Sequence, residues 1–232
     1  MITQAVVYKG KALEPRNLTY FFLIAFGLPA LAALPFIAGL LRMPSGAGLS
    51  AIFASPSVFL ITLGGWGPII AAFTVTALTE GKAGARELWK RFWNNRIGIK
   101  WLFVTLLLLP AAQLFANTIM RVLDPQPHPL FNLPNPPWTV IFLFAYAFIF
   151  TGMAEEFGWR GYVLPRLQAR WNALTSSIVL GVIWAAWHIP NWLLPVGNLQ
   201  RPSFWLWALG LIMFSILMTW VLNNTSPDFS HV

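Results

Sequence analysis

The sequence predicts an all-α fold, a polytopic membrane bundle of six transmembrane helices, from three observations. Charged residues make up only 9% of the 232 residues, against roughly a quarter in a soluble chain. Hydrophobic residues make up 57%, with 13 Trp and 19 Phe, which is more apolar surface than a soluble domain of this size can bury. Apolar stretches of about 20 residues, long enough to cross about 30 Å of hydrocarbon as a helix, recur along the chain. Lipid is therefore the expected solvent for much of the surface.

Six stretches meet or approach this length, and we expect each to be one span. They cover residues 19–41, 57–79, 101–120, 138–154, 171–195 and 203–222. Residues 1–18 are polar and lack an apolar core followed by a small-residue cleavage site, so we expect no signal peptide. The predicted organisation is thus an N-terminal segment (1–18), a helical bundle (19–222) and a C-terminal tail (223–232).

Basic residues alternate between the segments that join the spans. Lys and Arg number three before the first span, then one, six, one, three, one and none, so 12 of the 15 lie on one side. By the positive-inside rule that side is the cytoplasm, and we expect the N-terminus and the basic loop 82–100 there, in the plasma membrane of a bacterium. The formal charge of +8 is therefore a topology signal, and no nucleic-acid partner is expected. The basic loop could also contact anionic lipid headgroups.

Proline, glycine and cysteine usage add three expectations. Residues 124–137 contain six prolines, which favours an extended external loop with His128 as a solvated side chain. Gly64-Gly65-Trp66-Gly67-Pro68 interrupts the second span and predicts a kink or close helix packing rather than a ligand loop. The absence of Cys excludes a disulfide scaffold, an iron–sulfur site, a zinc ribbon and a thiol nucleophile.

Ionisable residues within or beside spans are costly in lipid and therefore mark candidate functional positions. Glu155, Glu156 and Arg160 directly follow the fourth predicted span, and His188 lies late in the fifth. On a helix Glu156 and Arg160 are four residues apart in the favourable acid-before-base order, whereas Glu155 points about 100° away and has no local partner. Such a carboxylate suits a general base. The alternative interpretation places both glutamates at lipid headgroups, with His188 held by a backbone carbonyl among tryptophans.

Helix length decides whether these residues can share a site. If the fourth helix ended at Ala154, Glu155 and His188 would lie at opposite faces of the membrane. If it continues past Pro165 to a turn near 168–170, Glu155 lies about 20 Å and His188 about 26 Å from that turn. We favour the second arrangement, because a buried Glu–Arg pair needs the matched spacing more than a solvated pair does. Two carboxylates, an arginine and an imidazole in one hydrated cavity could activate a water directly or on a divalent metal such as zinc.

These motifs resemble a known family. Glu155-Glu156-x-x-x-Arg160, followed about 30 residues later by Trp184-x-x-x-His188, is similar to the EExxxR and FxxxH motifs of the CPBP family of CAAX prenyl endopeptidases and bacteriocin-processing or immunity proteins. The resemblance covers roughly residues 66–225. It implies a helical intramembrane endopeptidase that cleaves a membrane-associated, in some cases prenylated, protein or peptide. Glu155 would activate the water, Glu156 and Arg160 would order the site, and His188 would bind the water or, with Glu156, a metal.

The sequence departs from the family pattern in two places. Trp184 stands where the family usually has Phe, and we expect it only to keep an aromatic wall. The family usually continues with a helix bearing His-x-x-x-Asn or Asp, whereas this sequence stops ten residues after Leu222 with His231 in the tail. We therefore expect either a truncated chain or a site that has lost residues. Two alternatives stay open: a catalytically impaired bacteriocin-immunity or membrane-scaffold protein, and a proton-coupled transporter that uses the two glutamates and His188.

Overall fold

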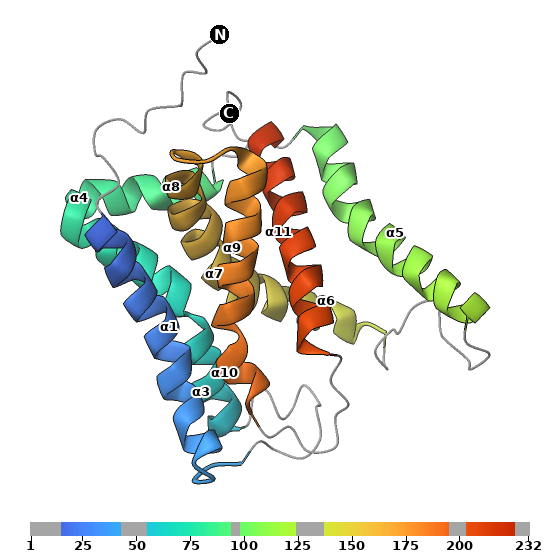
Figure 1. Cartoon of the computed structure of the whole chain (residues 1–232), viewed down its shortest axis with the longest axis horizontal. Coiled ribbons are helices and arrows are strands. Elements are labelled where there is room, and N and C mark those ends of the chain that lie inside the picture. Colours follow the sequence, from blue (N-terminus) through green and yellow to red (C-terminus); the bar gives the residue numbers. More distant parts are fainter. Residues whose placement is uncertain (1–14, 43–54, 94–97, 124–136, 195–202, 226–232) are drawn as a thin grey trace.

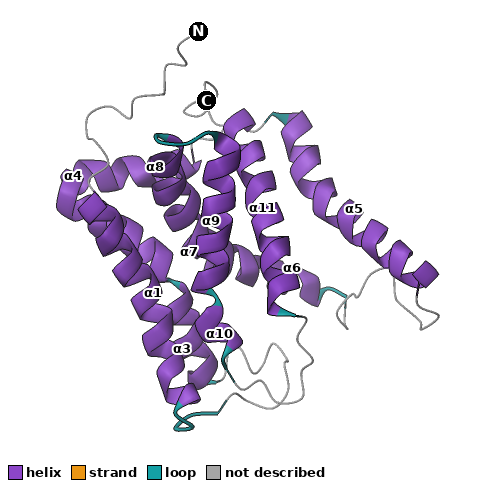
Figure 2. Ribbon diagram, in the orientation of Figure 1, coloured by secondary structure: helices purple, strands orange, loops and turns teal. Residues whose placement is uncertain are grey.

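All regular structure in the described part of the chain is helical, which confirms the predicted fold class (Figures 1 and 2). The computed structural model describes residues 15–42, 55–93, 98–123, 137–194 and 203–225. Most of the predicted N-terminal segment, the proline-rich loop with His128, and the end of the tail with His231 lie outside these ranges.

Three described helices are long and apolar enough to span a membrane: α1 (Pro15–Ile37), the continuous helix Thr139–Gln168, and α11 (Phe204–Thr225). A fourth candidate is the bent pair α3 (Pro56–Gly65) and α4 (Gly67–Trp93). Further apolar helices are α5 (Ile99–Leu123), which lies at the side of the bundle in Figure 1, and α9 (Ala173–Trp187). A polytopic helical bundle therefore accounts for the apolar stretches of the sequence.

Helices α1, α4 and α9 meet at one backbone carbonyl. The indole Nε1 of Trp187 on α9 donates a hydrogen bond of 2.7 Å to the carbonyl oxygen of Ala25 on α1. Gly67, the first residue of α4, lies against the same oxygen, and a Cβ there would be 2.5 Å from it. The bend of 45° between α3 and α4 falls at this contact, so the predicted kink with close packing is confirmed.

The helix that carries the two glutamates is longer than the predicted span 138–154. It runs through α6 (Thr139–Tyr146), η1 (Ala147–Met153), α7 (Ala154–Gly158), η2 (Trp159–Val163) and α8 (Leu164–Gln168). The segments η1 and η2 are π-helical, a wide turn that is frequent at functional sites. Pro165 follows η2 and has no N–H for a carbonyl four residues earlier, which a locally widened turn accommodates. The arrangement in which this helix continues past Pro165 is confirmed, and the span boundary at Ala154 was wrong.

The fifth predicted span, 171–195, is broken at His188. Helix α9 ends at Trp187, and the short helix α10 (Ile189–Trp192) follows. Pro190 has no N–H to donate to the carbonyl of Ala186 four residues earlier, and its ring crowds that carbonyl, which explains the break. Along its length α9 packs on α11, where Gly181 lies so close to Ile212 that a Cβ would be 2.7 Å from its Cα.

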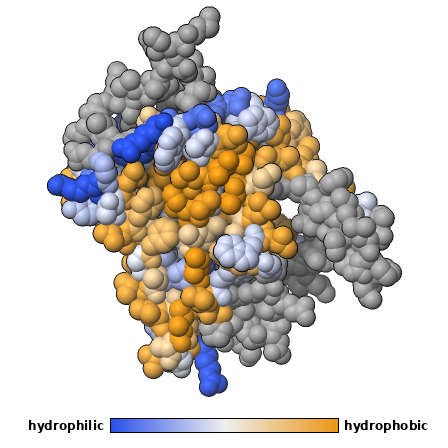
Figure 3. Space-filling view, viewed as in Figure 1, coloured by the Kyte–Doolittle hydropathy of each residue, from blue (hydrophilic) through white to orange (hydrophobic). Residues whose placement is uncertain are grey.

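The predicted basic loop 82–100 is helical up to Trp93. Helix α4 turns at Gly81, whose φ of 70° and ψ of −169° are open to glycine but not to other residues, and then continues. In Figure 1 this green end of α4 crosses the upper end of the bundle. Figure 3 shows hydrophilic surface along the same upper end, above a broad band of hydrophobic surface.

Candidate active site

Glu155 is held by a tryptophan of another helix. It lies in α7, is only 6% exposed, and its Oε2 accepts a hydrogen bond from the indole Nε1 of Trp184 on α9. The indole Nε1 of Trp159, one turn further along, is buried and has no hydrogen-bond partner among the described residues. Within the described residues Oε1 of Glu155 has no hydrogen-bond partner. One oxygen is therefore fixed by the protein, and the other is left to interact with a substrate or a water.

Glu156 and Arg160 form the predicted ion pair. The Nη1 of Arg160 lies 2.9 Å from Oε1 of Glu156, and the two side chains are 6% and 20% exposed respectively. The guanidinium also lies over the ring of Trp184, 4.2 Å from its centroid. Its Nε and Nη2 are buried and have no hydrogen-bond partner among the described residues. A buried cation with two unused donors, held in place by a carboxylate and an aromatic ring, can stabilise negative charge that develops beside it.

His188 lies one helical turn beyond Trp184, between α9 and α10. Its Nδ1 is 2.8 Å from the carbonyl oxygen of Trp184, and because a carbonyl only accepts, Nδ1 carries the proton. The imidazole is enclosed by the rings of Trp187 and Trp207, with centroids 4.7 Å and 4.9 Å away. Nε2 is then the nitrogen that can accept a hydrogen bond.

Trp184 therefore joins the predicted site residues. Its indole N–H donates a hydrogen bond to Glu155, and its ring face lies against the guanidinium of Arg160. Its carbonyl oxygen accepts a hydrogen bond from Nδ1 of His188. The structure brings Glu155, Glu156 and Arg160 together with this tryptophan, and it places His188 on the same helix as the tryptophan rather than in a hydrogen bond with a glutamate.

The site helix is closely packed on α4. Gly158, two residues after Glu156, lies against Pro68, and a Cβ at Gly158 would be 2.4 Å from the Cβ of Pro68. Phe157 stacks on Trp89 with ring centroids 5.5 Å apart and an interplanar angle of 6°. These contacts leave α7 little freedom to move relative to α4, which suits a site that must be preorganised.

The predicted metal ligands do not form a complete ligand set. A catalytic zinc site uses three protein ligands. Among the described residues no group of three or more His, Asp or Glu side chains could hold a metal ion. Glu156 is paired with Arg160, and His188 uses Nδ1 on a backbone carbonyl. The metal role of Glu156 and His188 stays a prediction, and we derive no chemical step through a metal.

Comparison with known proteins identifies the domain that carries this site. Residues 136–227 match a family model described as Type II CAAX prenyl endopeptidase Rce1-like. This part of the chain is similar to the Rce1-like family. The range includes the two glutamates, Arg160, Trp184 and His188, so the family resemblance inferred from the two motifs is confirmed. The chain is also 29% identical, over 174 residues, to CAAX prenyl protease 2 of Methanococcus maripaludis. That alignment covers 66% of this chain and 61% of the length of the relative.

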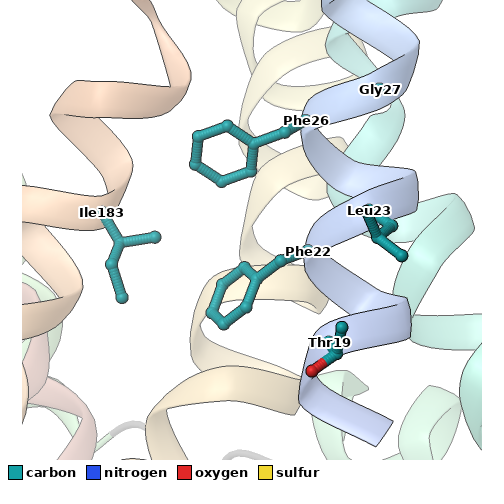
Figure 4. A pocket seen from close by; sticks show the side chains of 6 residues that line it. All are labelled: Thr19, Phe22, Leu23, Phe26, Gly27 and Ile183. Carbon is teal, nitrogen blue, oxygen red and sulfur yellow. The ribbon is translucent and has the colours of Figure 1, made fainter. Parts of the chain in front are cut away.

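An apolar groove of about 650 Å³ lies between α1 and α9, and α9 is part of the region that matches the family model. It is lined by Thr19, Phe22, Leu23, Phe26, Gly27 and Ile183. Figure 4 shows the two phenylalanines pointing from α1 toward Ile183, which is the residue directly before Trp184 on α9. An apolar chain lying in this groove would therefore run alongside the helix that contacts Glu155.

Sequence reasoning missed the hydrogen-bonding role of Trp184. The motif comparison treated its ring as an equivalent of Phe, which has no N–H. The available signal was chemical: a buried indole N–H needs an acceptor, and the predicted site offers few besides the glutamates.

Proposed function

We propose that the protein is an intramembrane endopeptidase that hydrolyses a peptide bond of a membrane-associated protein or peptide. The observation that carries the proposal is the buried carboxylate of Glu155, fixed by Trp184 and flanked by the Glu156–Arg160 pair, inside the region that matches the Rce1-like family model. The matched family and the relative are both named for CAAX prenyl substrates, so a prenylated C-terminal peptide is the first substrate class to test.

In the proposed mechanism Glu155 is the general base. Its Oε1 takes a proton from a water, and the water oxygen forms a bond to the carbonyl carbon of the scissile peptide. The carbonyl oxygen becomes an oxyanion. When the intermediate collapses, the C–N bond breaks, and the leaving amine takes the proton from Glu155. The products are a carboxylic acid and an amine, and Glu155 returns to its starting state.

Two further residues support these steps. The unused Nε and Nη2 of Arg160 supply donors and positive charge for the oxyanion, in a place shielded from bulk water. The Nε2 of His188 can accept a hydrogen bond from the attacking water, since Nδ1 is committed to the carbonyl of Trp184. Trp184 is a positioning residue, because it holds the carboxylate without touching the reacting atoms.

The apolar groove between α1 and α9 is suited to the lipid chain of such a substrate. Its lining is almost entirely hydrocarbon and is contributed by α1 and α9 (Figure 4). A prenyl chain lying there would bring the attached peptide from the membrane to the site, without first passing through water.

The decisive experiment replaces Glu155 by Gln in the full chain, reconstituted in lipid nanodiscs. Cleavage of a fluorogenic farnesylated peptide is expected to fall by about 10²- to 10⁴-fold, the usual contribution of a general base. The matched control is Glu87→Gln, because Glu87 is a solvent-exposed glutamate on α4 that pairs with Lys90. Unchanged cleavage by the Glu155 variant would overturn the proposal as written, and absence of cleavage by the wild-type chain would favour the alternative of an immunity or scaffold protein.

A further inference from the structure

The part of α4 that follows Gly81 has a basic side and an apolar side. Lys82, Arg86 and Lys90 are spaced four residues apart, so they form one stripe on the helix, and all three are exposed. Leu88 points to the other side and is only 4% exposed. Glu87 is the sole acidic residue between 82 and 93, and it pairs with Lys90 at 2.9 Å. The stripe therefore keeps a net positive charge.

This helix is fixed to the end of the bundle rather than projecting from it. Just before the turn at Gly81, Glu80 forms an ion pair of 3.4 Å with Arg166 of α8. Leu88 packs at Gly161, where a Cβ would be 3.1 Å from its Cδ1. Trp89 stacks on Phe157 while remaining 46% exposed. A half-exposed tryptophan between an apolar contact and a basic stripe is typical of the membrane–water interface.

The location of the helix matches a headgroup layer. Figure 3 shows hydrophilic surface at this end of the molecule and hydrophobic surface directly below it. The helix runs across the end of the spans in Figure 1. The Lys and Arg distribution assigns this end to the cytoplasmic leaflet, where anionic lipids attract basic segments.

We propose that residues 82–93 form an interfacial helix that binds anionic phospholipid headgroups through Lys82, Arg86 and Lys90. The charge of the stripe is complementary to these headgroups, and the half-exposed indole of Trp89 is the residue directly before Lys90 of the stripe. The same helix contacts the α7 segment that carries the glutamates, through Trp89 and Phe157. Anionic lipid thus stabilises the helix against which the candidate active site is packed.

The proposal is tested by lipid selectivity, a measurement that does not require activity. The full chain is reconstituted in nanodiscs of phosphatidylcholine with 30% phosphatidylglycerol, and the immobilised fractions of spin-labelled phosphatidylglycerol and phosphatidylcholine are compared. Wild type is expected to immobilise the anionic lipid preferentially. The triple variant Lys82→Gln, Arg86→Gln, Lys90→Gln is expected to lose this preference, with about fivefold in local lipid affinity lost for each basic residue. Raised salt is expected to weaken the preference, because it screens exposed charges.

The matched control removes three exposed arginines from elsewhere in the chain, at positions 16, 42 and 170. It changes the net charge by the same amount and is expected to keep most of the selectivity. Equal selectivity in the triple variant and wild type, or an equal loss in the control, would overturn the proposal. Hydrogen exchange of α9 and α11 amides verifies folding. If the triple variant is unfolded by that criterion, Arg86→Gln alone carries the test, with an expected loss of about fivefold in affinity.

Discussion

Replacement of Trp184 by Phe tests whether the indole N–H positions the carboxylate of Glu155, the proposed general base. The substitution removes the hydrogen bond to Oε2 of Glu155 but keeps an aromatic ring under Arg160 and beside Phe214, whose ring centroid lies 6.0 Å away. A hydrogen bond to a charged group contributes about 1.5–3 kcal/mol. If the hydrogen bond holds the carboxylate in its reactive orientation, its loss raises the activation free energy of cleavage by this amount. Each increase of about 1.4 kcal/mol in the activation free energy lowers the rate tenfold.

We therefore expect kcat for a farnesylated peptide to fall by about 10- to 150-fold, while KM changes by less than about threefold. The assay is steady-state cleavage in nanodiscs, because kcat and KM separate an effect on the reacting groups from an effect on substrate binding.

The matched control is Trp187→Phe, which is the same chemical change three residues away on the same helix. The indole of Trp187 donates to the backbone carbonyl of Ala25 rather than to Glu155. We expect this control to lower thermal stability and to leave kcat within about threefold of wild type. The positioning role is refuted if Trp184→Phe retains the wild-type kcat, or if both substitutions lower kcat equally.

Three other predictions follow from contacts on the same helices. Gly158→Ala should lower the free energy of unfolding by about 1–3 kcal/mol, because the added Cβ would overlap Pro68. The control Gly152→Ala should not lower it, because the nearest atom to a Cβ there is 3.5 Å away. Equal melting temperatures of the two variants would contradict this prediction. Gly27→Leu should raise KM for a farnesylated peptide several-fold but leave KM for the same peptide without its lipid unchanged. A Cβ at Gly27 meets nothing within 4 Å, so the leucine side chain would fill the groove. An equal effect on both peptides would show that the groove does not hold the lipid. Glu156→Gln should lower stability by about 3–5 kcal/mol, since it leaves the buried Arg160 without its carboxylate, and a melting temperature equal to that of wild type would mean that the pair is effectively solvated.

The helical class and the main spans could be predicted from the sequence, because lipid demands about 20 apolar residues per span. The ends of the helices could not. Counting apolar residues stopped the fourth span at Ala154, since the next residue is charged, yet the helix continues to Gln168, and Glu155 and Arg160 are buried in it. The fifth apolar stretch includes Pro190, so it was predicted as one continuous span, and the break at His188 was not predicted.

The candidate site could be predicted in part for a related reason. The spacing of Glu156 and Arg160 fixes which side of a helix they share, so their pairing followed from local geometry. The partner of Glu155 lies 29 positions away, and its identity depends on how α7 and α9 pack. Likewise, residues 82–93 were expected to be a loop because of their charge, and only the contacts of Leu88 and Trp89 with the site helix show why they are helical.

The burial of Glu155, Glu156 and Arg160 in one helix also affects the biogenesis of the protein. A charged residue near the middle of an isolated inserting helix costs about 2.5–3.5 kcal/mol, and only the Glu156–Arg160 pair can be neutralised within this helix. The remaining carboxylate has its hydrogen-bond donor on α9, which the ribosome makes later. The segment Thr139–Gln168 therefore gains its full stability in the membrane only after the following helix has been synthesised. Insertion of these two helices is expected to be coupled, with the hydrogen bond between Trp184 and Glu155 formed as they enter the bilayer together.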